Sequence, residues 1–217
     1  TFAIEPFKIP SGSMKPNLLV GDFLFVSKWD YGYSRYSFPF GLPPFKGKIF
    51  ESSPKRGDII VFKLPGKENI NYVKRLIGLP GEKVKVLNGE VYIKKTNSSN
   101  FELLDQVEDG LFYDDQYGTD IQQLIENEYK ILNITNDGPL DYTPEYEIPK
   151  DKFFFMGDNR DNSSDSRILS GVGFVPKVNI VGKVWFIWFS VDTDFSLSKF
   201  WNLPFHIRYD RLFNVIK

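Results

Sequence analysis

The sequence contains no cysteine and only one histidine, His206. The absence of cysteine excludes thiol nucleophiles, disulfide bonds and zinc sites with cysteine ligands. A Ser-His-Asp triad, or a metal site with several histidine ligands, would have to use His206 or not exist. We therefore expect neither a metal ion nor a cofactor in this protein.

Long apolar runs are missing as well. No stretch reaches the about 18 apolar residues that a membrane-spanning helix needs. The longest candidate, residues 184–189, has the length of a buried strand. No secretory signal peptide is visible. Because the chain begins with Thr1 rather than methionine, we expect that an upstream segment has been removed.

The composition is that of a folded protein with an uneven charge. Of the 217 residues, 41% are hydrophobic and 25% are charged, which excludes extensive disorder. Residues 1–86 hold 14 lysines and arginines against 7 acidic residues, whereas residues 87–150 hold 4 against 14. We therefore expect a core of residues 1–93 plus 150–217, large enough for a catalytic domain, and an inserted acidic domain of residues 94–149. No dense Lys/Arg stripe or recognition helix is present, so no nucleic-acid partner is expected.

Short β-rich runs between turn signals predict a mostly β fold, arranged as a sandwich or a partly open barrel. These runs are residues 22–26, 59–62, 71–77, 83–87, 90–93, 153–156 and 180–191. Asn88-Gly89 lies between two of them and predicts a tight hairpin, because a type I′ turn needs positive φ at both central residues. The aromatic content of 17% also favours strands over helical bundles.

Two stretches are harder to interpret. Proline-rich residues 31–50 predict a loop rather than a central strand or a helix. In the acidic stretch, residues 129–134 suit a strand, but the apolar residues also have partial helical spacing, and both alternatives stay open. The apolar residues with that spacing are Ile121, Leu124, Ile125 and Leu132.

The first candidate for chemistry is Ser11-Gly12-Ser13. Glycine lets the backbone approach a ligand closely, one hydroxyl can act as a nucleophile, and a neighbouring hydroxyl or N–H can stabilise an oxyanion. An ordinary turn has the same composition. A nucleophilic serine also needs a base, and His206 is one candidate, although a surface or interface histidine is the simpler interpretation.

Lysine is the other candidate base. Lys74 lies in a predicted strand, where it shares one face with Tyr72 and Leu76. An inward face would bury the amine and lower its pKa, which would make a general base available without histidine. The alternative is that Arg75 is buried in a salt bridge while Lys74 is in solvent.

A polar loop, residues 156–167, follows an apolar predicted strand. Asp158, Asp161 and Asp165 offer oxygen ligands for a cation, but the loop lacks the glycine and the terminal glutamate of an EF-hand. The alternative is a self-bonded structural loop that places one hydroxyl near a site.

These three segments occur together and in this order, and through them the chain resembles the bacterial type I signal peptidases. The matching motifs are residues 9–14 with Gly21-Asp22, residues 56–59, Lys74-Arg75 with residues 78–81, and residues 157–163 with 165–167. The resemblance implies a mostly β catalytic fold with an inserted β-rich cap domain, and a serine endopeptidase that removes signal peptides from exported preproteins. The acidic segment matches no motif that carries a function.

The resemblance also assigns roles to individual residues. It makes Ser13 the nucleophile and Lys74 the general base. Ser11 and the backbone N–H of Ser13 would stabilise the oxyanion, and Ser163 would orient the amine of Lys74. Asp165 and Arg167 would form a supporting ion pair.

The substrate implied by the resemblance is an extended peptide that is cut after small residues at positions −1 and −3. It would lie beside the strand that ends near Lys74, in the manner of an added strand. The positions that match the two side-chain pockets are mostly apolar: Phe7, Ile9, Pro10, Met14, Leu18, Leu24, Val61, Tyr72 and Val73.

A membrane setting follows from the same resemblance. We expect a monomer on the outer side of the bacterial cytoplasmic membrane, with an N-terminal transmembrane anchor that precedes the residues in hand. Aromatic residues would rest on the lipid surface, or would be core residues, and both interpretations stay open. These aromatic residues are Phe2, Phe7, Tyr31, Tyr33, Phe38, Phe40, Phe45, Trp201 and Phe205.

Other functions compete with this one. Self-cleaving repressors share a Ser/Lys dyad but need an N-terminal DNA-binding domain, which the 12 residues before Ser13 are too few to form. Pilin peptidases of conjugation systems share the dyad too, but they are usually shorter and lack a large cap. A catalytically silent β-rich module that binds extended peptides or a membrane surface is the alternative from a different class.

Overall fold

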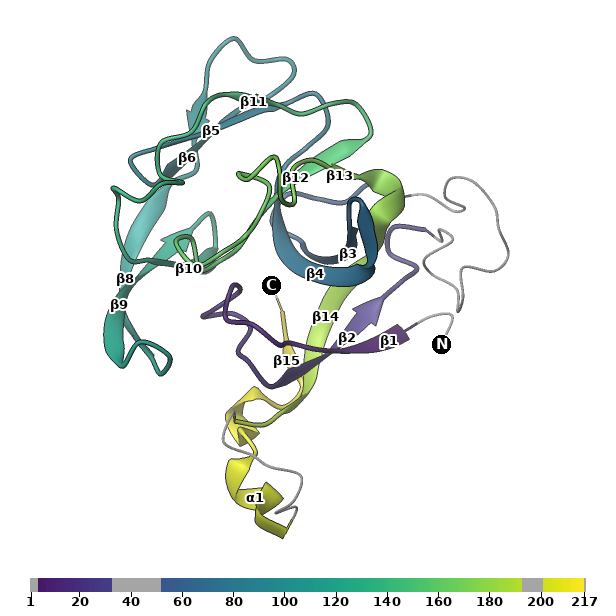
Figure 1. Cartoon of the computed structure of the whole chain (residues 1–217), viewed down its shortest axis with the longest axis vertical. Helices are drawn as coiled ribbons and strands as arrows, with labels where there is room; N and C mark the ends of the chain where they lie inside the picture. Colours follow the sequence, from purple (N-terminus) through teal and green to yellow (C-terminus); the bar gives the residue numbers. More distant parts are fainter. Residues whose placement is uncertain (1–3, 33–51, 193–200, 217) are drawn as a thin grey trace.

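The computed structural model describes residues 4–32, 52–192 and 201–216, and these residues are mostly β strand (Figure 1). The largest sheet has eight strands in the order β1-β2-β14-β3-β4-β12-β13, with β15 paired to β14. Its strands are β1 (Ile4–Lys8), β2 (Asp22–Ser27), β3 (Ile59–Leu64), β4 (Lys67–Gly78), β12 (Lys152–Met156), β13 (Val175–Pro176), β14 (Ile180–Ser190) and β15 (Asn214–Val215). The prediction of a mostly β fold is confirmed.

Two smaller sheets complete the described part of the chain. One has the order β11-β5-β6-β7 and the other the order β10-β9-β8. Their strands are β5 (Lys83–Leu87), β6 (Glu90–Lys94), β7 (Glu102–Leu103), β8 (Gln106–Asp114), β9 (Thr119–Glu126), β10 (Tyr129–Asn133) and β11 (Tyr146–Glu147). None of the three sheets closes into a barrel.

Helices are few and short in the described ranges. They are α1 (Leu203–His206) and the 3-10 helices η3 (Lys177–Asn179) and η5 (Tyr209–Arg211). None of them has the length and apolar character that crossing a membrane requires. The arrangement of the active-site residues therefore depends on strands and on the loops between them.

The predicted hairpin at Asn88-Gly89 is confirmed. β5 and β6 pair antiparallel, with Leu87 opposite Glu90, so that two residues form the turn. Asn88 has φ 54° and Gly89 has φ 76°, the positive values that a type I′ turn requires.

The ambiguous acidic stretch forms strands, so the helical interpretation was wrong. β9 and β10 pair antiparallel around a turn in which Asn127 and Glu128 both have positive φ. Polar residues account for the weak alternation in the sequence, because Gln123 and Glu126 are buried on β9. Apolar periodicity alone does not reveal a strand with polar residues at inward positions.

The acidic segment packs against the large sheet. Ile77 of β4, Val84 of β5 and Ile131 of β10 belong to one buried hydrophobic cluster, which therefore joins all three sheets. The four-stranded sheet pairs β5 with β11 and β6 with β7, so it contains strands from both sides of the boundary expected at residues 93/94. That boundary stays a prediction.

The aromatic residues expected at a membrane surface divide into several groups. Trp201 and Phe205 are 62% and 86% exposed, while Phe7 packs partly buried against a core cluster. Tyr31 follows the core interpretation, because it is 4% exposed and its hydroxyl donates to Asp58 Oδ2 at 2.6 Å. Phe2, Tyr33, Phe38, Phe40 and Phe45, with most of the loop expected at 31–50, lie outside the described residues.

Candidate active site

The loop between β1 and β2 carries Ser13. Its two ends are joined, because Ile9 N donates to Asp22 O at 2.8 Å and Gly21 N donates to Ile9 O at 3.1 Å. Gly21 has φ +90°, and a Cβ at this position would lie 2.0 Å from Val191 O. Only glycine fits there, which explains the Gly-Asp pair in the sequence motif.

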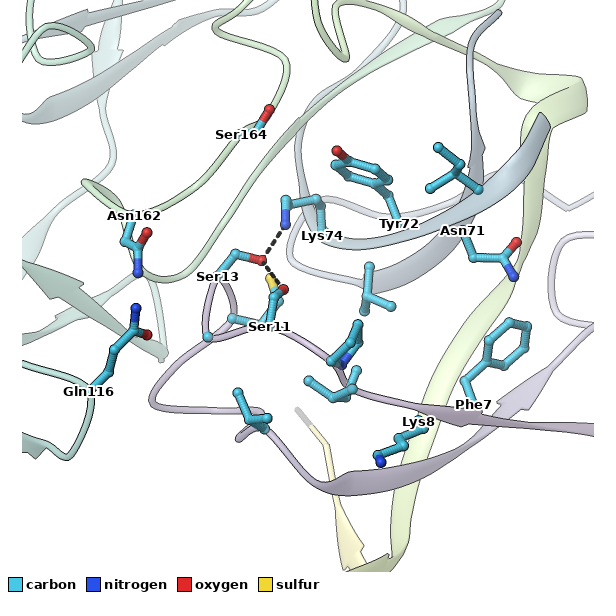
Figure 2. A pocket seen from close by; sticks show the side chains of 17 residues that line it. Phe7, Lys8, Ser11, Ser13, Asn71, Tyr72, Lys74, Gln116, Asn162 and Ser164 are labelled. Atoms are coloured by element: carbon cyan, nitrogen blue, oxygen red, sulfur yellow. Dashed lines mark hydrogen bonds between the residues drawn. The ribbon is translucent and has the colours of Figure 1, made fainter. Parts of the chain in front are cut away.

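Lys74 reaches this loop from β4 (Figure 2). Its Nζ donates to Ser13 Oγ at 2.5 Å, and Ser11 Oγ lies 3.4 Å from Ser13 Oγ. Lys74 is 3% exposed. Burial lowers the pKa of its amine from 10.5 to about 8, although the negative charges of Asp165 and Asp158 oppose the shift. About half of the Lys74 amines are therefore neutral at pH 8.

This arrangement is suited to nucleophilic catalysis. A neutral amine that contacts a hydroxyl can accept its proton as the oxygen attacks an electrophile. Ser11 is exposed beside Ser13, so its hydroxyl is available to a substrate oxygen. The three side chains come from two segments, residues 11–13 and β4, which sequence analysis had selected independently.

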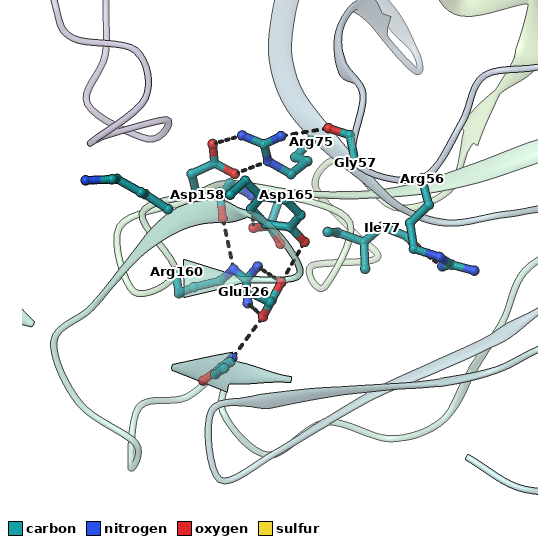
Figure 3. Close-up of polar contacts among 12 residues, drawn as sticks. Arg56, Gly57, Arg75, Ile77, Glu126, Asp158, Arg160 and Asp165 are labelled. Atoms are coloured by element: carbon teal, nitrogen blue, oxygen red, sulfur yellow. Dashed lines mark hydrogen bonds and ion pairs between the residues drawn. The ribbon is translucent and has the colours of Figure 1, made fainter. Parts of the chain in front are cut away.

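Lys74 and Arg75 are both buried, because the two faces of β4 are both covered at this point. Arg75 Nε and Nη2 donate to the two carboxylate oxygens of Asp158 at 2.7 and 2.8 Å (Figure 3). Arg75 Nη1 donates to Gly57 O at 2.7 Å. The alternative of a buried Arg75 with a solvated Lys74 was therefore wrong for the lysine. Asp158 also accepts from Asn17 Nδ2 at 2.7 Å, which connects the ion pair to the loop between β1 and β2 that carries Ser13.

The polar loop after β12 approaches the loop that carries Ser13 closely. Asn159 N donates to Ser13 O at 3.2 Å, and Asn159 Nδ2 donates to Gly12 O at 3.3 Å. A Cβ on Gly157 would lie 2.6 Å from Ser13 O and 2.2 Å from Ser163 Oγ. The two loops are in contact at this point because residue 157 has no side chain.

Asp165 and Arg167 form the expected ion pair. Arg167 Nε and Nη2 each donate to a carboxylate oxygen of Asp165 at 2.9 Å. Burial raises the pKa of the Asp165 carboxyl, but the charge and hydrogen bonds of Arg167 outweigh it, and the net pKa is lowered. Ser163 Oγ is buried, and a hydrogen bond from its hydroxyl also lowers the pKa of the Asp165 carboxyl. Its role towards Lys74 stays a prediction.

A groove of about 750 Å³ opens beside Ser13 and Lys74. The groove is lined by six of the nine expected pocket residues: Phe7, Ile9, Pro10, Met14, Tyr72 and Val73. The other three do not line it; Leu18, Leu24 and Val61 belong instead to the buried hydrophobic cluster that contains Ile9 and Met14. Leu18, Leu24 and Val61 support the groove without facing it.

Sequence analysis missed several residues of the groove. They are Lys8, Val20, Ile70, Asn71, Gln116, Asn162 and Ser164. Asn162 and Ser164 lie in the polar loop that the sequence had already indicated. Gln116 lies in the turn between β8 and β9, within the acidic segment, where no motif pointed to a function.

The alternative base and the three possible cation ligands from the sequence analysis lie outside the groove or have other partners. His206, in α1, has its Nδ1 2.9 Å from Asp192 Oδ1 and does not line the groove. Asp158 and Asp165 bind arginine side chains, and Asp161 Oδ2 accepts from a backbone N–H at 2.7 Å. Across residues 4–32, 52–192 and 201–216, no three His, Cys, Asp or Glu residues are grouped as a metal site would require.

Comparison with known proteins identifies a family and several relatives of this chain. A family model described as "Signal peptidase, peptidase S26" matches residues 1–189. The chain is 41% identical over 198 residues to Signal peptidase I of Rickettsia typhi and 42% identical to that of Rickettsia akari. Each match covers 86% of this chain and 72% of the relative. A crystal structure of a signal peptidase I from Enterococcus faecalis matches with 29% identity and a TM-score of 0.38, over 61% of this chain and 97% of that one.

Proposed function

Because the chain belongs to the signal peptidase family, peptidase S26, and is a serine endopeptidase of signal peptides, we propose that Ser13 and Lys74 are its catalytic dyad. The observation that carries the proposal is the contact of 2.5 Å between Lys74 Nζ and Ser13 Oγ. Burial lowers the pKa of that amine to about 8, so the base is partly neutral near neutral pH.

The mechanism uses one amine in both halves of the reaction. Lys74 accepts the proton of Ser13 while Oγ attacks the carbonyl carbon of the scissile bond. The oxyanion forms beside the Ser11 hydroxyl and the Ser13 N–H, which stabilise it as donors. The charged Lys74 then gives its proton to the leaving amine. In the second half it deprotonates the water that hydrolyses the acyl-enzyme.

The lining of the groove supports a proposal for the substrate class. We propose that an extended peptide lies along it with small side chains at −1 and −3. Ile9 and Met14 on one side and Tyr72 and Val73 on the other offer apolar contacts. Ile9 and Met14 are buried in a core cluster and cannot move aside for a bulky side chain, so small residues are favoured.

Membrane association is part of the proposal. Trp201 and Phe205 are largely exposed, and amphipathic or apolar aromatic rings partition favourably into the membrane interface. The excess of lysine and arginine in residues 1–86 suits an anionic lipid surface. These two features support contact with an anionic membrane surface, and we propose that the protein acts there as a monomer on the outer side of the bacterial cytoplasmic membrane. Co-sedimentation with phosphatidylglycerol vesicles tests it, and binding unchanged in a Trp201→Ala, Phe205→Ala double variant would argue against this surface.

The decisive experiment is cleavage of a peptide with alanine at −1 and −3 by the wild type, Ser13→Ala and Lys74→Ala across pH. The expected result is cleavage after the −1 alanine, lost in both variants, with a rising limb of kcat/KM near pH 8. No cleavage by the wild type in detergent or lipid would favour a catalytically silent peptide-binding module. Full activity in Lys74→Ala would mean that another group is the base.

A further inference from the structure

The tip of the β8–β9 hairpin reaches the loop that carries Ser13 from the acidic segment. Lys15 Nζ donates to Asp114 Oδ1 at 2.8 Å and to Asp115 Oδ1 at 2.7 Å. The side chains of Lys15 and Asp114 are 5% and 0% exposed, so water does not compete for this contact. Because Lys15 follows Ser13 by two residues, the ion pair fixes the hairpin tip next to the nucleophile.

The same carboxylate positions Gln116. Asp114 Oδ1, which binds Lys15, also accepts from Gln116 N at 2.9 Å. Gln116 Oε1 lies 3.7 Å from the place where a Cβ on Gly12 would be, and the residue lines the groove. The Gln116 amide therefore lies within van der Waals reach of residue 12, directly beside the loop that carries Ser13.

Asn162 faces Gln116 from the polar loop. Figure 2 shows the amide nitrogens of the two side chains pointing toward one another, on the other side of Ser13 from Phe7 and Tyr72. Neither side-chain amide has a hydrogen-bond partner among the described residues. Gln116 is exposed and Asn162 is half-buried, so both amides are open to a ligand, and one carbonyl oxygen placed between their N–H groups can accept from both.

We propose that Gln116 and Asn162 bind a main-chain carbonyl of the substrate on the leaving-group side of the scissile bond, and that Lys15 is the residue that positions Gln116. This inference rests on the proposed function. A peptide whose −1 and −3 side chains occupy the apolar part of the groove must continue past Ser13, and an extended chain advances about 3.3 Å per residue toward the amide pair. Because the contact is to the main chain, the subsite accepts mature proteins of differing sequence.

The test compares two peptides with the same residues up to −1. The short peptide ends as an amide at +1, and the long peptide continues to +5. Gln116→Ala is expected to lower the long-to-short ratio of kcat/KM by about three- to tenfold, the range of one net hydrogen bond. Asn162→Ala is expected to act in the same direction. A ratio equal to that of the wild type in both variants would overturn the inference.

Gln122→Ala provides the matched control. Gln122 lies on β9 of the same hairpin, its amide donates to Glu108 at 3.2 Å on the exposed surface, and it does not line the groove. Its substitution should leave the long-to-short ratio at the wild-type value. A ratio lowered by Gln122→Ala as much as by Gln116→Ala would mean that loosening the hairpin, rather than losing an amide contact, causes the effect.

Lys15→Met tests the positioning role. The expected result is the same loss of the long-to-short ratio, with the rising pH limb of kcat/KM unmoved, because the amine of Lys74 is untouched. If this variant does not fold, Gln116→Ala decides alone. The two proposals fail differently: a wild type that cuts neither peptide refutes the proposed function, whereas cleavage that needs Ser13 but shows no dependence on Gln116 or Asn162 refutes only this inference.

Discussion

Lys74→Met is expected to abolish cleavage and, at neutral pH, to stabilise the fold. The buried amine has its pKa lowered from 10.5 to about 8. That difference corresponds to about 3 kcal/mol, the free energy that the folded protein loses by holding a charged lysine in a place that favours the neutral form. Methionine has a similar length and no charge, so the variant does not bear this cost.

The sign of the pH dependence follows from proton binding. With a lower pKa in the folded state than in the unfolded state, Lys74 binds fewer protons when the chain is folded. The wild type therefore gains stability from this group as the pH rises from about 8 to 10.5, and bears the full cost below pH 8. The free energy of unfolding of Lys74→Met should therefore exceed that of the wild type by about 3 kcal/mol at pH 7 and by between about 1 and 2 kcal/mol at pH 9.5.

Urea denaturation of the wild type and Lys74→Met at pH 7 and pH 9.5 measures how the difference between their free energies of unfolding changes with pH. Loss of the hydrogen bond to Ser13 adds a contribution that is largely common to both pH values, and the other titrating groups are shared by the two proteins. Lys67→Met, an exposed position on the same strand β4, is the control and should show no such change. An advantage of Lys74→Met that is equal at the two pH values would refute the reasoning from burial.

Contacts around the site lead to three more predictions. Gly157→Ala places a Cβ 2.6 Å from Ser13 O, so kcat should fall about 10- to 100-fold in a protein with a native circular dichroism spectrum; a wild-type kcat would contradict the close approach of the loops. Arg160→Met leaves the buried carboxylate of Glu126 without its arginine and should lower the free energy of unfolding in urea by about 3–5 kcal/mol. Tyr31→Phe removes a hydrogen bond to a carboxylate, so it should cost about 1.5–3 kcal/mol of stability and leave kcat/KM unchanged; a large loss of activity would place this residue nearer to catalysis than its burial indicates.

Local chemistry explains which features were predictable. Asn88-Gly89 determines its turn through backbone preferences that need no distant partner. The strand period of two placed Lys74 on one face with Tyr72 and Leu76, but it did not decide whether that face lay inward, and a solvated Lys74 stayed open. Its contact with Ser13 joins residues 61 positions apart, and the family resemblance rather than any local rule linked them.

The acidic segment was less predictable because its buried positions are not apolar. Glu126 is fully buried on β9 and is paired with Arg160, which lies in a different part of the chain. A sequence pattern indicates which residues are hydrophobic, but it does not indicate that a carboxylate has a buried arginine partner. For the same reason Gln116 gave no signal, since its place in the groove depends on how the β8–β9 hairpin packs.

The expected pocket residues show a second limit of prediction from sequence. Leu24 and Val61 are as apolar as Phe7 and Val73, and all four lie in or near strands that border the site. Only the tertiary arrangement decides which side chains face the groove and which face the core behind it. Hydrophobic character therefore identified the neighbourhood of the pocket, while the division between lining and supporting residues needed the structure.

The acidic segment is part of the catalytic framework rather than an independent attachment. The chain around Asp158 and Arg160 pairs with β10 on one side, because Leu132 N donates to Asp158 O and Arg160 N donates to Leu132 O, both at 2.9 Å. On its other side, Asn159 N donates to Ser13 O. A shift of β10 would therefore move the same short segment that binds the carbonyl oxygen of Ser13. The geometry at Ser13 thus depends on strands far from the groove, and changes in the acidic segment should alter catalysis without touching the dyad.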